Sequence, residues 1–341
     1  MSHQHEGFVY DHLLYELHAR NRSNLTILET LIQNQRLVQK GLILPGRFPG
    51  LFAGTGTGER KIYDAQQKQT LPGAKARFEG DAATNDTTVD NAYTFHGGVK
   101  DFLSKVVKRN SIDDLGMALV GTVHYGRKYN NAFWNGSQMT YGDGDGELFS
   151  TFVIEDVVGH EMAHGVTEKT SGLIYQGQSG ALNEHFSDVV GVLCRQYRAG
   201  LTADKDTWLV GPGLWTTKVN GRALRDMLNP GTAYDDPKVG KDPQPAHMKD
   251  LYTGWSDNGG VHINSGIPNR AFANFARAVG GNAWERPFEI WYATNCGTNR
   301  VGSKADFKAF ALKTLENCKA LHPSLEAALK AAWVEVAVLT A

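Results

Sequence analysis

The chain has 341 residues, of which 41% are hydrophobic and 21% charged, the composition of an ordinary globular protein. The formal net charge of -1 offers no basic surface, so we expect no nucleic-acid partner. No run of about 18 apolar residues occurs, and we expect no membrane span. The N-terminus lacks the apolar segment of a Sec signal peptide, which predicts a cytoplasmic protein or one exported by another route. The three cysteines form no CxxC pair, which favours reduced core thiols.

Residues 8–40 carry helical periodicity, because apolar residues recur three and four positions apart. Two series of residues mark the apolar stripe, namely Leu25, Leu28 and Ile32, and Ile27, Leu31 and Val38. The polar residues Glu29, Gln33 and Lys40 lie outside this stripe. Residues 44–61, LPGRFPGLFAGTGTGERK, follow with two prolines and five glycines, and this composition predicts a linker. Residues 1–52 are therefore expected to form a short helical lead with a flexible connection.

Residues 61–150 alternate short apolar and aromatic runs with Gly, Asn and Asp turns, which indicates a β-rich region. From residue 151 the periods lengthen, and residues 199–260 are loop-rich. The expected helices lie near 151–169, 179–198, 264–280, 283–296, 304–318 and 323–339. The sequence thus predicts an α+β fold with a β-rich lobe over residues 53–169 and a helical lobe over residues 170–341.

The motif HEMAH, residues 160–164, lies on the first predicted helix of the second half. Residues four apart share one helix face, so His160 and His164 can direct two imidazoles at one ion. Glu161 lies beside them, and this pattern is typical of zinc sites in which the glutamate acts as general base. A chance HExxH on a polar helix face is the alternative that the motif alone leaves open.

A catalytic zinc ion needs a third protein ligand and one open position. Glu184, in GALNEHFSDVV, comes 20 residues after His164, which leaves room for a turn at Gly172 and an antiparallel return helix. Asp188 lies four residues further on the same face, where it can accept a hydrogen bond from a ligating histidine and fix its tautomer. His185 points elsewhere on that helix, so we do not expect it to be a ligand.

The stretch HEMAHGVTEKTSGLIYQGQSGALNEHFSD resembles the active-site region of the thermolysin-like metallopeptidases. The segments NNAFWNGSQMTYGDGDG at 130–146 and DNGGVHINSGI at 257–267 resemble the same family, and LRDMLNP at 224–230 does so more weakly. These motifs stand in the family's order, and the resemblance covers about residues 60–341. It implies a two-lobed zincin fold with the zinc site in the cleft between the lobes.

The resemblance implies a role for each matched residue in a zinc-dependent neutral endopeptidase that cuts before large apolar residues. His160, His164 and Glu184 would bind Zn²⁺, and Glu161 would be the general base. Tyr175 and His262 would donate hydrogen bonds to the oxyanion, with Asp257 orienting His262. Arg225 would hold a substrate carbonyl, Asn131 and the Ala132 backbone would bind an extended peptide as an added strand, and Leu224 and Val157 would line the specificity pocket.

The chain also departs from the family, in which many members bind a pair of calcium ions behind the active site. Asp156 matches one calcium ligand, but Arg195 stands where the neighbouring helix should supply a carboxylate. An arginine cannot coordinate calcium and would repel it, so calcium is doubtful at this place.

The short lead of this chain resembles that of the protealysin-like subgroup. It predicts that residues 1–50 are an inhibitory prosegment and the chain's own intramolecular partner. The linker from Leu44 to Gly58 is long enough to cross the cleft, and it contains Leu51 and Phe52. We therefore expect self-processing at Gly50–Leu51 or Leu51–Phe52.

Two alternatives to a general endopeptidase remain open on the sequence. One is a binding protein with a zincin shape and no turnover, although such a protein would be expected to have lost Glu161 or a ligand. The other is a hydrolase restricted to small peptides.

Overall fold

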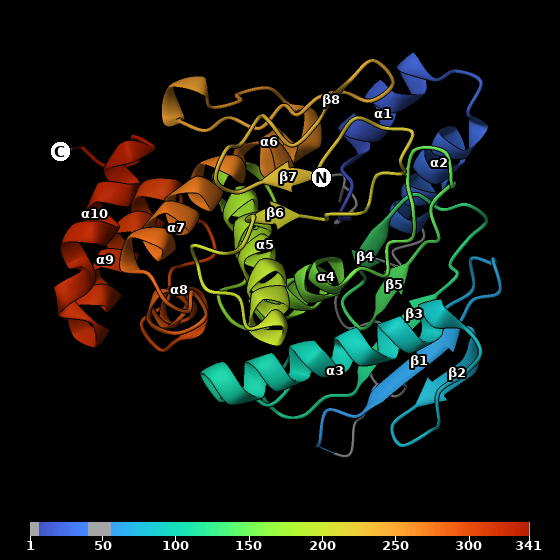
Figure 1. Cartoon of the computed structure of the whole chain (residues 1–341), viewed down its shortest axis with the longest axis horizontal. Helices are drawn as coiled ribbons and strands as arrows, with labels where there is room; N and C mark the ends of the chain where they lie inside the picture. Colours follow the sequence, from blue (N-terminus) through green and yellow to red (C-terminus); the bar gives the residue numbers. More distant parts are fainter. Residues whose placement is uncertain (1–6, 40–55, 341) are drawn as a thin grey trace.

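The computed structural model describes residues 7–39 and 56–340, with the N-terminal helices beside the sheet and the C-terminal helices at the opposite end of the molecule (Figure 1). The elements before the centre of the chain are α1 (Asp11–Arg20), α2 (Leu25–Gln39), β1 (Arg60–Asp64), β2 (Ala74–Phe78), α3 (Thr87–Val107), β3 (Leu119–Val123), β4 (Ala132–Trp134), β5 (Met139–Tyr141), α4 (Glu155–Glu168) and α5 (Gly177–Ala199). The later elements are β6 (Leu209–Val210), β7 (Arg225–Asp226), β8 (Asp235–Asp236), β9 (Gly240–Lys241), η1 (Met248–Asp250), α6 (Ser256–Asn264), α7 (Gly266–Val279), α8 (Arg286–Cys296), α9 (Phe307–Leu321), η2 (Pro323–Leu325) and α10 (Glu326–Glu335).

The main sheet has the strand order β2-β1-β3-β5-β4. β1, β3 and β5 run parallel, and the outer strands β2 and β4 pair antiparallel with their neighbours. Phe133 on β4 also forms an antiparallel bridge with Gly7, so the start of the described chain pairs with the edge of this sheet. The predicted α+β class is confirmed.

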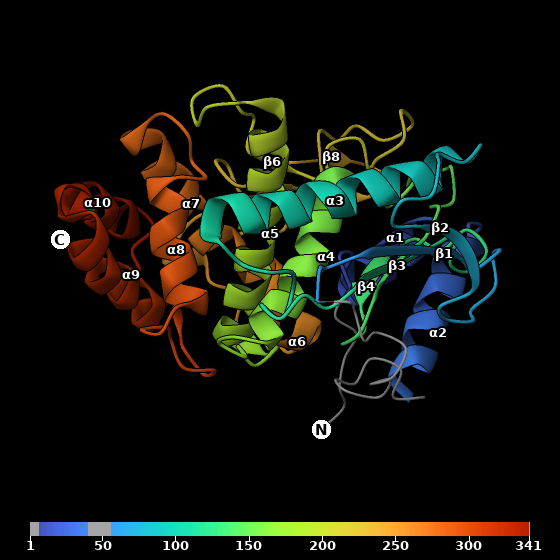
Figure 2. The ribbon, with the colours of Figure 1, turned by 90° about the horizontal axis from the view of Figure 1, so that it is seen from below.

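The prediction that residues 61–150 are β-rich is incomplete, because they also contain the 21-residue helix α3. Asp86 caps its first turn by accepting hydrogen bonds from the Thr88 and Val89 amides. The helix lies along the sheet in both views (Figures 1 and 2). Its interior glycine Gly97 faces Arg60, where a Cβ would approach the guanidinium to 2.5 Å.

The predicted helical half is confirmed, with α4, α5, α7, α8, α9 and α10 within a few residues of the expected ranges. Residues 199–260 are loop-rich as expected, with four two-residue strands and a single 3₁₀ turn before α6. Within residues 7–39 and 56–340, no helix combines the length and the apolar character that a membrane crossing requires.

The close packing of α4 on α5 depends on two glycines. A Cβ on Gly159 would lie 2.9 Å from Gly191 Cα, and a Cβ on Gly191 would lie 2.3 Å from the Asp156 carbonyl oxygen. Larger side chains would therefore push the helices apart. Because His160 follows Gly159 on α4, this contact sets how near the motif comes to α5.

The helical periodicity of residues 8–40 corresponds to two helices, α1 and α2. Asn21 ends α1, and the Asn24 side chain accepts a hydrogen bond from the Thr26 amide at the start of α2. Ile27 and Leu31 are buried as expected, but Leu25 and Ile32 are exposed. Gln33, expected outside the apolar stripe, is buried together with Thr30 and Asn34 on the face toward the rest of the protein. The bonds near Leu51 and Phe52 at which self-processing is expected lie outside the described residues.

Candidate active site

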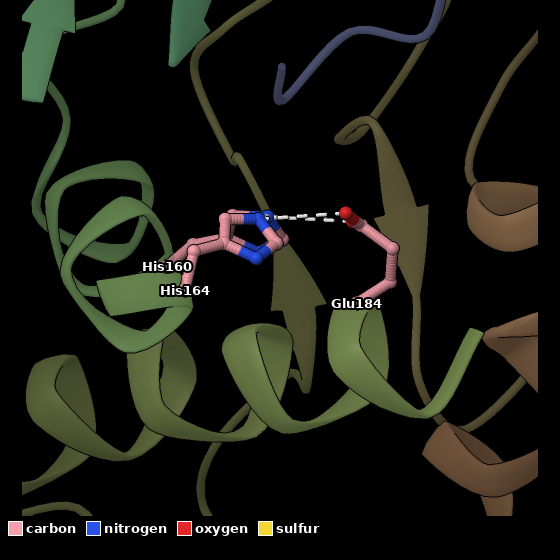
Figure 3. A group of neighbouring side chains, drawn as sticks. All are labelled: His160, His164 and Glu184. Carbon is pink, nitrogen blue, oxygen red and sulfur yellow. Dashed lines mark hydrogen bonds and ion pairs between the residues drawn. The ribbon is translucent and has the colours of Figure 1, made fainter. Parts of the chain in front are cut away.

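His160 and His164 on α4 and Glu184 on α5 direct their side chains at one point (Figure 3). Their ligand atoms all lie within 4.8 Å of one another, and all three residues are buried. The two Nε2 atoms are 3.0 Å apart, and each histidine Nε2 lies 3.4 Å from a Glu184 carboxylate oxygen. Two histidines four apart on one helix and a glutamate from the antiparallel neighbour thus form the predicted group.

The opposite ring nitrogen of each histidine has its own acceptor. His160 Nδ1 lies 2.9 Å from Asp188 Oδ1, as predicted, and His164 Nδ1 lies 2.8 Å from Asn183 Oδ1. With Nδ1 as the donor, the Nε2 lone pairs of neutral rings face each other and Glu184, and a cation would satisfy this arrangement. Tetrahedral zinc with nitrogens at about 2.0–2.1 Å separates two such ligands by roughly 3.4 Å, so the donor set fits this metal.

The pKa values of the group agree with such a site. Burial lowers the pKa of His164 to about 4, which keeps its imidazole in the neutral form that binds metals. Burial also opposes charge on His160, but Glu184 and Asp188 outweigh it and raise the pKa to about 9, so a metal ion would displace a proton there. Burial raises the pKa of Glu161 to about 8, which is suited to a group that exchanges protons near neutral pH.

His262 reaches the same point from α6. Residues 257–260 all have positive φ angles, between 51° and 81°, and this left-handed turn brings Asp257 back to the following helical turn. Asp257 Oδ1 lies 2.6 Å from His262 Nδ1, and Oδ2 accepts hydrogen bonds from the His262 and Ile263 amides. The segment DNGG is therefore both a turn and the support of His262.

Tyr175 completes this side of the site. Its hydroxyl donates to Glu184 and lies 3.1 Å from His262 Nε2. Burial opposes the charged form of His262, but the carboxylates of Glu184 and Asp257 outweigh it and raise the pKa. A protonated His262 can donate from both ring nitrogens.

Arg225 is fully buried beside the same histidines. Its Nε and Nη2 atoms donate to the two oxygens of Asp188, at 2.8 and 2.6 Å, in a bidentate pair. Asp188 thus links His160 to Arg225. His185, the neighbour of Glu184, instead contacts Asn269 and Trp291, as expected for a residue that is not a ligand.

Residues 7–9 of the same chain lie against these side chains. The Phe8 amide donates to the Ala132 carbonyl at 3.0 Å. The Asn131 side chain accepts from the Val9 amide at 2.8 Å and donates to the Val9 carbonyl at 2.9 Å. Asn131 and Ala132, predicted to bind an extended peptide, therefore hold the chain's own N-terminal segment.

The ring of Phe8 is fully buried among the predicted site residues. The Arg225 guanidinium carbon lies 4.7 Å from the ring centroid, and the ring meets His160 edge-on with centroids 4.9 Å apart. A Cβ on Gly211 would lie 3.3 Å from the ring and 3.6 Å from Leu224 Cβ. Val157, three residues before His160, belongs to the same core cluster as Phe8 and Leu224.

Two carbonyl groups of the segment face donors of the site. Arg225 Nη1 lies 3.4 Å from the Phe8 carbonyl oxygen, and His262 Nε2 lies 2.9 Å from the Gly7 carbonyl oxygen. The Tyr10 ring stacks on His262 with centroids 5.3 Å apart. These contacts were missed from the sequence, because Phe8 and Tyr10 carry no motif.

Arg195 occupies the place where the family resemblance implied calcium. Its guanidinium donates to Asp156 at 2.7 Å, to the Leu209 carbonyl at 2.8 Å and to Asp206 at 3.2 and 3.3 Å. The Asp156 carboxylate also accepts from the Gly211 amide. Because an arginine already neutralises these carboxylates, the residues at this place do not fit a calcium ion.

Comparisons with known proteins agree with this geometry. Residues 50–168 match the thermolysin metallopeptidase catalytic domain, and residues 171–338 match the thermolysin metallopeptidase alpha-helical domain. An extracellular metalloprotease of Pectobacterium carotovorum subsp. carotovorum is 48% identical over 285 residues, 83% of this chain and 82% of that protein. A thermolysin of Alicyclobacillus acidocaldarius subsp. acidocaldarius is 46% identical over 213 residues, 61% of this chain and 36% of that protein.

Among solved structures, the precursor of protealysin, a metalloproteinase from Serratia proteamaculans, superimposes with a TM-score of 0.88 at 45% identity. The match covers 98% of this chain and 100% of that one, so it includes the N-terminal helices as well as both lobes. With both family domains matched in order and the two histidines and glutamate gathered at one point, the chain belongs to the thermolysin family of metalloendopeptidases.

Proposed function

We propose that the chain is the latent precursor of a zinc-dependent endopeptidase that hydrolyses peptide bonds before large apolar residues. The observation that carries the proposal is the position of residues 7–9. They pair with β4 as an extended peptide would, and a large apolar side chain, Phe8, is buried beside Arg225 and Leu224. An extended substrate adding to the same strand edge would make the same contacts.

His160, His164 and Glu184 would hold the zinc ion, with Asp188 and Asn183 fixing the two imidazoles. Zinc, when bound, supplies a Lewis acid that polarises a carbonyl and lowers the pKa of a bound water to about 7. Replacing His164 by Ala removes one of the three donors, so metal content should fall with it. Metal analysis of that variant tests the ligand assignment.

Glu161 would take the proton of the attacking water and pass it to the leaving amine. Its raised pKa supports both halves of this transfer near neutral pH. His262, held by Asp257, would donate to the carbonyl oxygen as negative charge develops there, and Tyr175 lies close enough to assist. Arg225 would hold the carbonyl of the substrate residue that follows the cut bond, as it holds that of Phe8.

The N-terminal segment would keep the precursor latent by covering this site. Its helices are fixed to the catalytic part by Asn24, which donates to Asp145 at 2.8 Å, and by Asn34, which accepts from Tyr129 at 2.6 Å. Buried leucines of α1 and α2 share the core cluster of the catalytic lobes. A substrate must therefore displace residues 7–10 before it can reach β4.

Casein digestion with and without a chelator tests the proposal. After incubation with zinc, wild-type protein should digest casein, a chelator should stop it, and zinc should restore it. A zinc-loaded protein without turnover would favour the silent binding protein, and cleavage of dipeptide amides but not casein would favour the small-peptide hydrolase.

The extracellular metalloprotease among the relatives supports an extracellular site of action for this chain.

A further inference from the structure

The peptide bond between Gly7 and Phe8 lies between two residues of the candidate site, His262 and Arg225. The Gly7 carbonyl oxygen accepts from His262 Nε2 at 2.9 Å, the position proposed for the carbonyl under attack. The next residue, Phe8, places its ring beside Arg225 and Gly211, and its carbonyl faces Arg225. The two residues thus occupy the positions on either side of a bond that is to be cut.

The hydrogen bonds along β4 fix this register. The Phe8 amide donates to the Ala132 carbonyl, and both backbone groups of Val9 bind the Asn131 side chain. A shift by one residue would break all three contacts and remove the ring from its buried position, because successive side chains of an extended strand point to opposite sides.

We infer that the precursor cuts itself between Gly7 and Phe8, within one molecule, and that the ring of Phe8 selects this bond. The inference rests on the proposed peptidase activity. In the step, water adds its hydroxyl to the Gly7 carbonyl carbon and the C–N bond to Phe8 breaks. A proton passes through Glu161 to the Phe8 nitrogen, so the products are a Gly7 carboxylate and a Phe8 amine.

The cut alone leaves the site covered. Residues from Phe8 onward keep their contacts with Arg225 and Asn131, and the helices keep theirs with Asp145 and Tyr129. The new amine end would then lie in the site as a bound product. Removal of residues 1–7 is therefore a step separate from release of the helical segment.

The experiment follows purified full-length protein by intact mass and N-terminal sequencing after zinc addition, at two concentrations tenfold apart. The expected result is early loss of residues 1–7, a new N-terminus at Phe8, and one rate constant at both concentrations. Zinc-loaded Glu161→Ala should keep its full length. A rate constant that rises tenfold with concentration, or the same cut in Glu161→Ala, would overturn the inference.

The double substitution Phe8→Val with Val9→Phe is the matched control, because it keeps the composition and moves the ring by one residue. The cut should move to the bond between residues 8 and 9, and an unchanged cut after Gly7 at the wild-type rate would overturn the role of the ring. Casein digestion separates the two levels of failure. If casein is digested while the Gly7–Phe8 bond stays intact, this inference alone is wrong; if neither is cut, the proposed function fails.

Discussion

Replacing Phe8 by Ala should open the site of the precursor, since Phe8 is the apolar anchor of the N-terminal segment. Its side chain is fully buried and its ring contacts Arg225 and His160. Removing a buried phenylalanine side chain costs about 3–5 kcal/mol in a rigid core. The lower end suits a terminal segment that can adjust, and about 3 kcal/mol corresponds to a factor of about 10² in the fraction of molecules with a free site.

The assay uses a zinc-loaded Glu161→Ala background, in which the chain is not expected to process itself. A fluorescent peptide that carries leucine at its centre binds only when the segment is displaced, so its apparent Kd is the intrinsic value divided by the open fraction. The Glu161→Ala, Phe8→Ala protein should bind the peptide about 10²-fold more tightly than Glu161→Ala alone.

Leu25→Ala is the matched control, because Leu25 is also a large apolar residue of the N-terminal segment but is 61% exposed. It should leave the apparent Kd within a factor of about two, since exposed substitutions change stability little. Equal affinities for the Phe8 variant and its parent would refute the reasoning that Phe8 holds the segment in place. A thermal melt of each variant checks that the catalytic lobes remain folded.

Three further predictions concern catalysis, one concerns calcium, and one concerns the pH dependence of stability. With the segment removed, Glu161→Ala should keep zinc, but its kcat should fall by a factor of at least about 10², since general-base catalysis contributes a factor of about 10²–10⁴. Near-normal turnover would contradict the role of Glu161 as general base. In the wild type, the dependence of kcat on pH should include the ionisation of Glu161. A Glu161→Asp variant, whose carboxylate is set back by one methylene, should lose this part of the pH dependence, and an unchanged pH profile would contradict the assignment. His262→Ala should lower kcat more than it raises KM, whereas a change in KM alone would make it a substrate-binding residue. Millimolar calcium should change Tm little, because Arg195 fills the expected site, and a rise of about 10 °C or more would reveal a site that the structure does not indicate. The hydrogen bond to Asp143 outweighs burial and raises the pKa of His124 to about 9. The protonated histidine therefore stabilises the fold fully below about pH 6.5, and this contribution is lost as the pH rises through about 9. Urea unfolding at a series of pH values should show a loss of unfolding free energy on the order of 1 kcal/mol, after allowance for solvent screening, and His124→Gln should lack this loss.

The metal-binding group could be predicted from the sequence because its geometry is local. His160 and His164 share a helix face by their spacing alone, and Glu184 needs only one antiparallel turn to reach them. Of the two residues that lie against the Nδ1 atoms of these histidines, only one could be predicted. Asp188, one turn after Glu184, was predicted, whereas Asn183, which fixes His164, was not, since an asparagine beside a glutamate carries no distinguishing signal.

Helix α3 could not be predicted because its sequence opposes a helix locally. It contains Gly97 and Gly98 in its interior, and each costs about 1 kcal/mol relative to alanine. Gly97 faces the Arg60 side chain, whose guanidinium a Cβ would approach to 2.5 Å. Buried residues of this helix, including Val99 and Phe102, recover the cost by packing in the core, where the Phe102 ring contacts Tyr197 and Phe288. The periodicity was present, but the glycines made the segment resemble loops between strands.

The segment that covers the site in the structure, residues 7–10, was not predicted from the sequence. Leu51 and Phe52 in the linker carry the same apolar signal as Phe8, and nothing local separates them. What distinguishes Phe8 is long-range, namely the pairing of Gly7 with Phe133 and the contact with Arg225. The linker from residue 44 to 55 lies outside the described residues, so processing at residues 50–52 stays a prediction.

Asp188 links Arg225, which contacts the Phe8 carbonyl, to His160 of the candidate metal-binding group. One of its oxygens accepts from His160 Nδ1, and both accept from Arg225. Despite burial, which opposes its charge, Arg225 and His160 lower the pKa of Asp188 to about 2, so it stays ionised across the working range. The carbonyl that Arg225 holds is therefore set at a fixed distance from the imidazole that would bind zinc. A peptide that hydrogen-bonded to Arg225 and buried its ring beside it would have its preceding carbonyl at His262, which is the arrangement that Gly7 and Phe8 adopt.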